Sequence, residues 1–159
     1  MDYMLQSRKE GTTHDGKDYC LWFAKGKTVT TFNLAYALTS LGKKVLAVDF
    51  DSQSNLSTCM RIEDLRNEEK TIGHLMMAEI DDEPIEAVED FIQNNAGIDF
   101  ISSNVYFSAV DTKLRLEMGA EKMLSNILEP LRDRYDYILI DTAPTLGSLT
   151  INALAAADS

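Results

Sequence analysis

The sequence predicts an α/β fold in which a mostly parallel sheet carries helices on both faces. Three observations lead to this prediction. Short apolar runs alternate along the chain with longer segments of helical spacing, as in parallel strands joined by crossover helices. The runs are apolar at almost every position, which is typical of strands covered on both faces. Polar and acidic residues follow where the runs end, and open parallel sheets bind ligands at that edge.

The first third of the chain contains two expected strands and one helix. Residues 1–18 are polar and lack periodicity, so we expect an N-terminal arm there. The aromatic-rich run 19–24 predicts a buried strand. Apolar residues at helical spacing predict a helix over 28–40, with Gly42 just past its C-terminus. The apolar run 45–48 (VLAV) predicts the second strand.

The remaining two thirds continue the alternation of strands and helices. Gly97 leads into the third expected strand, and Gly119 separates two helical segments. Ordered along the chain, the expected elements are helices over 71–79 and 84–93, a strand over 98–102, helices over 108–117 and 121–132, a strand over 137–140 and a helix over 148–157.

Composition places the chain among globular proteins. Of its 159 residues, 45% are hydrophobic and 26% are charged, which excludes a disordered tail or a fibre. Two cysteines, Cys20 and Cys59, have neither CxxC nor metal-type spacing, as expected in a reducing compartment. Residues 1–17 have no apolar signal segment, and no apolar run is long enough to cross a bilayer. We therefore expect a cytoplasmic protein.

The net charge of −11 is unevenly distributed. Nine acidic residues lie between Thr71 and Thr112, where there is no Lys or Arg, so the rest of the chain carries only −2. An acidic surface repels phosphate backbones, which argues against a DNA-binding groove in this segment. A solvated helical surface is the simplest interpretation of such a run, ahead of an acidic docking site.

The first expected strand is followed by a possible phosphate-binding turn. The residues Lys25-Gly26-Lys27-Thr28 stand between this strand and the helix that follows. Gly-Lys-Thr at such a turn is the closing part of a phosphate-binding loop, in which backbone N–H groups hold phosphate, the lysine reaches the β/γ oxygens and the hydroxyl coordinates Mg²⁺. Alone, the three residues also fit an ordinary helix N-terminus with a solvated lysine.

Carboxylates follow two of the other expected strands. Asp49 and Asp51 come after the second strand, and Asp141 comes after the fourth. An acid directly after a buried apolar run is the usual place for a side chain that holds a Mg²⁺ shell, although each acid alone also fits a strand-end or turn residue. Because all three strand ends belong to one βαβ frame, together they favour a site for nucleotide phosphate.

From Lys25 to Ser159 the sequence resembles ParA/Soj-type chromosome or plasmid partition ATPases, of the deviant Walker A group that also contains MinD. The resemblance covers 135 of 159 positions and implies a P-loop NTPase domain over residues 19–159. The Asp51-Ser52-Gln53 turn favours ParA over MinD relatives. The matching segments are KGKTVTTFNLAYALTSLGKKVLAVDFDSQSNLSTCM (25–60), IDFISSNVYFSAV (98–110) and LEPLRDRYDYILIDTAPTLGSLTINALAAADS (128–159).

The resemblance implies a role for each candidate site residue. Lys27 corresponds to the phosphate-loop lysine, and Lys25 to the signature lysine that reaches a partner's nucleotide. The other implied roles are Thr28 as Mg²⁺ ligand, Asp51 as the residue that positions or activates the attacking water, Asp49 beside it in the first switch region, Asp141 as an acid that holds the Mg²⁺ shell through water, and the 142–147 turn as the second switch.

The family also implies cofactors and partners. ATP and Mg²⁺ are the expected cofactors, and ATP is sandwiched between two subunits of a homodimer. The ATP-bound dimer coats DNA nonspecifically, and a ParB-like centromere-binding protein stimulates hydrolysis and release. The implied location is the cytoplasm, in association with the nucleoid, and no membrane partner is expected.

Two features depart from the family pattern. The family loop reads KGGVGKT, whereas Lys25-Gly26-Lys27-Thr28 is three residues shorter, as if Gly-Gly-Val were missing. A backbone that wraps around phosphate needs several inward N–H groups, some at positive φ, and Gly26 is the only glycine here. We therefore expect strongly reduced nucleotide affinity. The chain also stops where the family enters its next strand, so we expect the C-terminal strands and the DNA surface to be missing.

Two alternatives follow from these departures. A truncated, non-hydrolysing subunit or gene fragment would at most pair with a full-length homologue. A small-molecule ligase or synthetase on the same scaffold is the other alternative. The Asp51–Gln53 turn and the Asp141-Thr142-Ala143-Pro144 turn fit partition proteins better than a synthetase.

Overall fold

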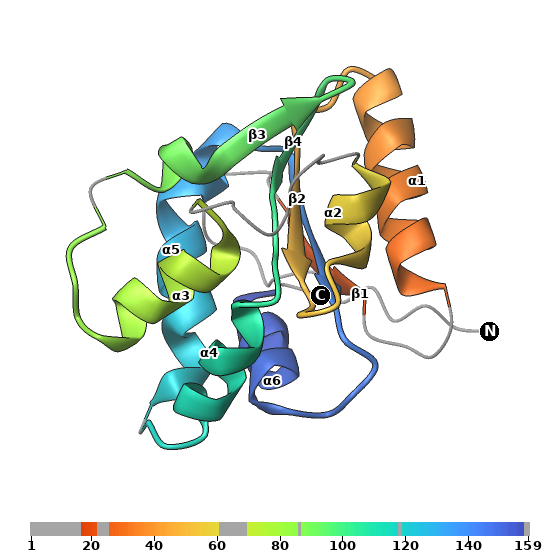
Figure 1. Ribbon diagram of the computed structural model, residues 1–159. Coiled ribbons are helices and arrows are strands. Elements are labelled where there is room, and N and C mark those ends of the chain that lie inside the picture. The colour runs from red at the N-terminus through yellow and green to blue at the C-terminus, as the bar shows by residue number, and fades with distance from the viewer. Residues whose placement is uncertain (1–16, 22–25, 61–69, 86, 118, 158–159) are drawn as a thin grey trace.

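A computed structural model describes residues 17–21, 26–60, 70–85, 87–117 and 119–157 (Figure 1). Within these ranges one sheet has the strand order β1-β5-β2-β4-β3. Every pair of neighbours is parallel except β3 and β4, so the predicted mostly parallel sheet is confirmed. The strands are β1 (Lys17–Leu21), β2 (Val45–Phe50), β3 (Ile92–Asn95), β4 (Ile98–Ile101) and β5 (Tyr137–Thr142).

Helices cover both faces of the sheet, as predicted. The helices α1 and α2 lie on one face, and α3 to α6 lie on the other (Figure 1). Short 3₁₀ turns flank α5, so the expected helix over 121–132 is divided into three pieces. The α-helices are α1 (Lys27–Ser40), α2 (Asn55–Cys59), α3 (Ile72–Ile80), α4 (Phe107–Leu114), α5 (Met123–Leu128) and α6 (Ser148–Ala156), and the 3₁₀ turns are Val88–Phe91, Ala120–Lys122 and Glu129–Arg134. Within the described ranges, no helix has both the length and the apolar character needed to cross a membrane.

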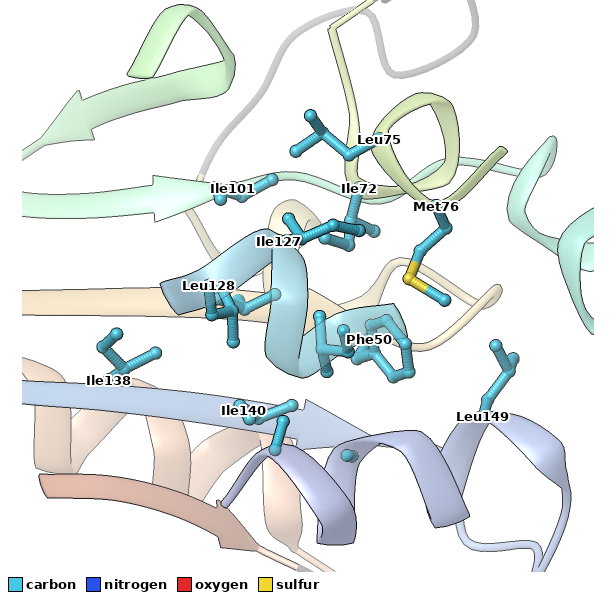
Figure 2. Close-up of a cluster of buried hydrophobic side chains, with 14 of the residues drawn as sticks. Phe50, Ile72, Leu75, Met76, Ile101, Ile127, Leu128, Ile138, Ile140 and Leu149 are labelled. Carbon is cyan, nitrogen blue, oxygen red and sulfur yellow. The ribbon is translucent and has the colours of Figure 1, made fainter. Parts of the chain in front are cut away.

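The alternation of side chains along β2 and β5 creates two cores. Figure 2 shows the larger core, where Phe50 and Ile140 meet residues of α3 and α5 such as Met76. The smaller core lies on the other face, where Ala47 and Leu139 pack with α1 and α2. Because side chains on a strand alternate with a period of two, the odd-numbered acids Asp49 and Asp141 face α1 and α2.

The four predicted strands differ in extent from the structure, and the strand predicted over 98–102 ends one residue earlier, at Ile101. β1 begins at Lys17 rather than at residue 19, and residues 22–24 lie outside the described residues. The prediction ends β2 at residue 48 and β5 at residue 140, but both strands continue for two more residues and contain Asp49 and Asp141. The physical reason is their mutual pairing, which aligns Asp49 with Asp141 and Phe50 with Thr142. Parallel pairing therefore places the two acids next to each other in the sheet.

The predicted helix over 84–93 is wrong. Its second half forms a 3₁₀ turn and then β3, which pairs antiparallel with β4. The two strands are joined by Ala96 and Gly97, with φ of 52° and 82°, the positive values that a two-residue hairpin turn requires. Ile85, Phe91 and Ile92 have helix-like spacing in the sequence, but they pack at the margin of the larger core without a continuous helix.

Replacing Gly97 with alanine is expected to lower the free energy of unfolding by about 1–2 kcal/mol, because an L-residue is disfavoured at φ of +82°. The added Cβ would lie 3.4 Å from Cγ2 of Thr39, so backbone conformation rather than a severe clash sets the cost. Urea unfolding measures the effect. Gly147→Ala is the matched control, since Gly147 has a φ of −126° and its added Cβ would meet only Asp111 Oδ1, at 3.9 Å. Equal losses in both variants would contradict the prediction.

Candidate nucleotide-binding site

The N-terminus of α1 is formed by the predicted Gly-Lys-Thr turn. Gly26 adopts φ of 98° and ψ of 9°, a left-handed conformation that glycine tolerates, and no side chain caps the helix. Its carbonyl oxygen accepts hydrogen bonds from the backbone N–H and the hydroxyl of Thr30, both at 2.9 Å. Lys27 and Thr28 follow as the first helical residues. Since N–H groups of a first turn lack intrahelical acceptors, this end of α1 suits an anion.

A pocket of about 330 Å³ opens beside this turn. It gathers residues from the α1 turn, from the segment after β2 and from the segment after β5, which lie far apart in the sequence. Two lining residues, Asn55 and Pro144, were not among the predicted site residues. Asn55 is the first residue of α2. In the sequence, only their place in polar loops at strand ends could have pointed to them. The lining residues are Gly26, Lys27, Thr28, Asp51, Asn55, Thr142 and Pro144.

Of the predicted site residues, four line this pocket and two lie behind it. Gly26, Lys27, Thr28 and Asp51 form part of the wall. Asp49 and Asp141 are each 1% exposed and do not line it. Lys25, the expected signature lysine, lies outside the described residues.

Asp51 is held in a compact turn at the end of β2. Its side chain is almost fully buried, and one carboxylate oxygen accepts a hydrogen bond from the backbone N–H of Gln53 at 2.9 Å. The carbonyl oxygen of Asp51 accepts another from the N–H of Ser54, which has a left-handed φ of 53°. The turn therefore fixes this carboxylate at the wall of the pocket.

Asp141 lies directly behind the Gly-Lys-Thr turn. Its Oδ1 accepts a hydrogen bond from the Thr31 hydroxyl at 3.4 Å, while Oδ2 is buried and has no hydrogen-bond partner within the described ranges. Burial raises the pKa of Asp141, and the Thr28 hydroxyl and the Lys27 charge act in the opposite direction. A buried oxygen without a donor is costly, so this atom suits a water in a Mg²⁺ shell beside Thr28.

The described part of the chain offers Mg²⁺ no cage made of side chains alone. No group of three or more His, Cys, Asp or Glu residues within it is arranged to hold a metal ion. Mg²⁺ commonly keeps several waters and takes one or two protein ligands together with phosphate oxygens. One hydroxyl, from Thr28, and one water-linked acid, Asp141, match that mode of binding.

Asp49 faces α2 instead of the pocket. Its Oδ2 accepts hydrogen bonds from the backbone N–H of Ser57 at 2.8 Å and from the Ser57 hydroxyl at 2.7 Å. Its Oδ1 accepts one from the N–H of Asp51 at 3.3 Å. Burial raises the pKa of Asp49 to about 7, against the opposite effect of the Ser57 hydrogen bonds. Asp49 thus links the end of β2 to α2.

The raised pKa of Asp49 predicts a pH-dependent stability in the absence of magnesium. The folded state holds the proton up to about pH 7, whereas the unfolded state releases it near the ordinary value of 3.8. The stabilisation that comes from protonation of Asp49 in the folded state is therefore complete below about pH 4 and is lost as the pH rises through about 7. The slope of the free energy of unfolding against pH that this group causes is at most about 1.4 kcal/mol per pH unit.

Denaturant unfolding of the parent and of Asp49→Asn, between about pH 5 and about pH 8, measures this contribution. The parent should gain stability relative to the variant as the pH falls, because the other titrating groups are shared by both proteins. A difference that stays constant across this range would contradict the prediction.

Comparison with known proteins agrees with the fold. Residues 24–159 match the family described as AAA domain. The chain is 35% identical over 136 residues to the sporulation initiation inhibitor protein Soj of Bacillus subtilis. The aligned region covers 84% of this chain and 51% of Soj. It is 34% identical over 134 residues to the chromosome partitioning protein ParA of Myxococcus xanthus, covering 84% and 46% of the two chains.

A solved structure shows the same architecture. Cobyrinic acid a,c-diamide synthase from Mycobacterium smegmatis, with bound ATP analogue and magnesium, superposes with a TM-score of 0.79 and 25% identity. The superposition covers 89% of this chain and 57% of the synthase. The α/β fold of this chain is thus the one found in this synthase.

The chain belongs to the AAA domain family that matches residues 24–159. Within it, the predicted resemblance to ParA/Soj-type partition ATPases is confirmed by relatives that carry those names. The chain spans about half the length of these curated relatives.

Proposed function

We propose that this chain is a ParA-like ATPase domain that acts in chromosome or plasmid partitioning and binds ATP with Mg²⁺ in the pocket beside α1. The observation that carries the proposal is the joint presence of Lys27, Thr28 and Asp51 around one pocket. Behind it lies a buried oxygen of Asp141 that has no hydrogen-bond partner among the described residues. The relatives named Soj and ParA support the partitioning role.

Each residue has a distinct part in the proposed reaction. The Lys27 ammonium would bind the terminal phosphates, and the N–H groups at the start of α1 would donate hydrogen bonds to their oxygens. Thr28 would hold Mg²⁺ directly and Asp141 would hold it through water. When bound by these residues, Mg²⁺ would supply positive charge that offsets the negative charge of the phosphates. The Asp51 carboxylate would orient the attacking water and accept its proton.

The proposed partners follow from the relatives. An ATP-dependent homodimer and a ParB-like centromere-binding protein are the expected partners, and nonspecific DNA is a partner of the full-length family. The cytoplasm, at the nucleoid, is the expected location. Lys25 stands only two residues before Lys27 in the shortened loop, so it could hardly reach the second subunit's nucleotide while Lys27 holds its own phosphate.

A second candidate function is a pairing subunit that binds ATP weakly and does not hydrolyse it. The short Lys25-Gly26-Lys27-Thr28 turn favours this alternative, because the left-handed conformation of Gly26 is followed at once by α1. Fewer loop N–H groups can then surround the phosphates. A synthetase with the same fold is less well supported, because the curated relatives named above are partition proteins.

Phosphate release from ATP, with and without Mg²⁺ and double-stranded DNA, tests the proposed function. Release that requires Mg²⁺, together with ATP-dependent sedimentation on DNA, supports the partition ATPase. ATP binding without release would favour the pairing subunit. A folded chain that neither binds ATP nor releases phosphate would contradict the proposed function.

A further inference from the structure

We propose that Ser57 is a positioning residue, which fixes the turn that carries Asp51 at the pocket and acts through Asp49. This inference deepens the proposed function, from which Asp51 takes its role. Ser57 itself lies in α2, is fully buried and does not line the pocket.

Three hydrogen bonds connect Ser57 to Asp51. The N–H and the hydroxyl of Ser57 both donate to Oδ2 of Asp49, at 2.8 Å and 2.7 Å. The other oxygen of the same carboxylate accepts from the N–H of Asp51 at 3.3 Å. The orientation of the Asp49 carboxylate therefore depends on Ser57, and the backbone of Asp51 depends on that orientation.

The Ser57 hydroxyl also accepts a hydrogen bond from the other side. The backbone N–H of Ser103, just after β4, donates to Ser57 Oγ at 2.9 Å. Ser103 and Asp49 are 0% and 1% exposed, so water does not compete for these contacts. One hydroxyl thus joins the end of β2, the helix α2 and the segment that follows β4.

Loss of this hydroxyl would remove one hydrogen bond from each of two buried groups. Oδ2 of Asp49 would keep only the N–H of Ser57, and the N–H of Ser103 would lose the hydroxyl acceptor. Unpaired buried polar groups are unfavourable, so the turn would rearrange toward other partners. Asp51, linked to Ser57 through the Asp49 carboxylate, would then lose its fixed position at the pocket wall.

The experiment compares Ser57→Ala, Ser57→Thr and the control Thr58→Ala. Thr58 is the next residue of α2, and its hydroxyl donates to the carbonyl of Ser54, 2.9 Å away, with no contact to Asp49. Amide hydrogen exchange measured by NMR reports on the N–H of Asp51 and of Ser103. Phosphate release at saturating Mg-ATP and the Kd for ATP separate turnover from binding.

For Ser57→Ala we expect amide exchange at Asp51 to be about tenfold faster and turnover to be about tenfold lower, with the Kd for ATP within about threefold of the parent. Ser57→Thr keeps the hydroxyl and should restore both values, while Thr58→Ala should change neither. If Ser57→Ala does not fold, Ser57→Cys replaces it, since a thiol is a weak hydrogen-bonding group of similar size.

Two results would overturn the inference. One is unchanged exchange at Asp51 in a folded Ser57→Ala or Ser57→Cys variant, and the other is an equal change in Thr58→Ala. A parent chain that releases no phosphate would contradict the proposed hydrolysis alone, because the exchange rate of the Asp51 amide still decides the positioning role of Ser57.

Discussion

Replacing Lys27 with alanine is expected to weaken the binding of Mg-ATP by about tenfold or more, because a hydrogen bond to a charged group contributes about 1.5–3 kcal/mol. Lys27 is the first residue of α1 and lines the pocket beside Gly26 and Thr28. Its ammonium therefore adds a full positive charge where the helix already presents N–H groups. Titration with a fluorescent ATP analogue measures the change in Kd.

The control for this variant is Lys43→Ala. Lys43 lies just past the C-terminus of the same helix, is exposed and is not part of the pocket wall. It removes the same charge from the protein without touching the proposed phosphate site. Equal binding by the parent and Lys27→Ala, with both proteins folded, would contradict the assignment of Lys27.

Inserting Gly-Gly-Val between Lys25 and Gly26 is expected to tighten ATP binding by about tenfold or more, since each added loop N–H that reaches a phosphate oxygen makes a charge-assisted hydrogen bond. The insertion restores the length of the family loop and supplies glycines for positive φ. Isothermal titration of the lengthened chain with Mg-ATP, beside the parent, measures the gain.

An insertion of Ala-Ala-Ala at the same place separates length from conformation. It lengthens the loop equally, but positive φ is unfavourable for alanine. The gain in ATP affinity should therefore be smaller than with Gly-Gly-Val. No gain in affinity with Gly-Gly-Val would show that the short turn does not limit nucleotide binding.

Most of the sheet could be predicted because its strands are apolar on both faces. The runs 45–48 and 137–140 have no other plausible environment than the centre of a covered sheet, and both lie there. The strand β3 (IQNN) could not be predicted in this way, because three of its four residues are polar. Its conformation depends on pairing with β4 and on the turn at Gly97, which local periodicity does not reveal.

The ion pairs of the acidic segment 71–112 could not be predicted from the sequence either. The sequence places nine acids between Thr71 and Thr112 with no Lys or Arg inside that range, but the fold supplies partners from outside it. Lys113 pairs with Asp81, and Arg134 pairs with Glu89. Lys70 lies 3.6 Å from Asp90. The predicted solvated surface is thus partly neutralised by contacts between segments.

The sequence predicts where the candidate site lies better than it predicts the hydrogen bonds that hold its residues. Parallel strands end at one edge, so Lys27, Asp51 and Asp141 could be expected to gather there. The period of two along β2 also gives the face on which Asp49 lies. It does not reveal that the N–H and the hydroxyl of Ser57 both donate to Oδ2 of Asp49, because that contact depends on how α2 packs against the sheet.

The most direct test of the proposed function is equilibrium binding of a fluorescent ATP analogue to the unaltered chain in the presence of Mg²⁺. We predict saturable binding that weakens when Mg²⁺ is removed and that unlabelled ATP displaces. A chain shown to be folded by circular dichroism and a cooperative thermal transition, yet without any binding, would contradict the account: the fold would then be inherited from ATPases without their nucleotide chemistry.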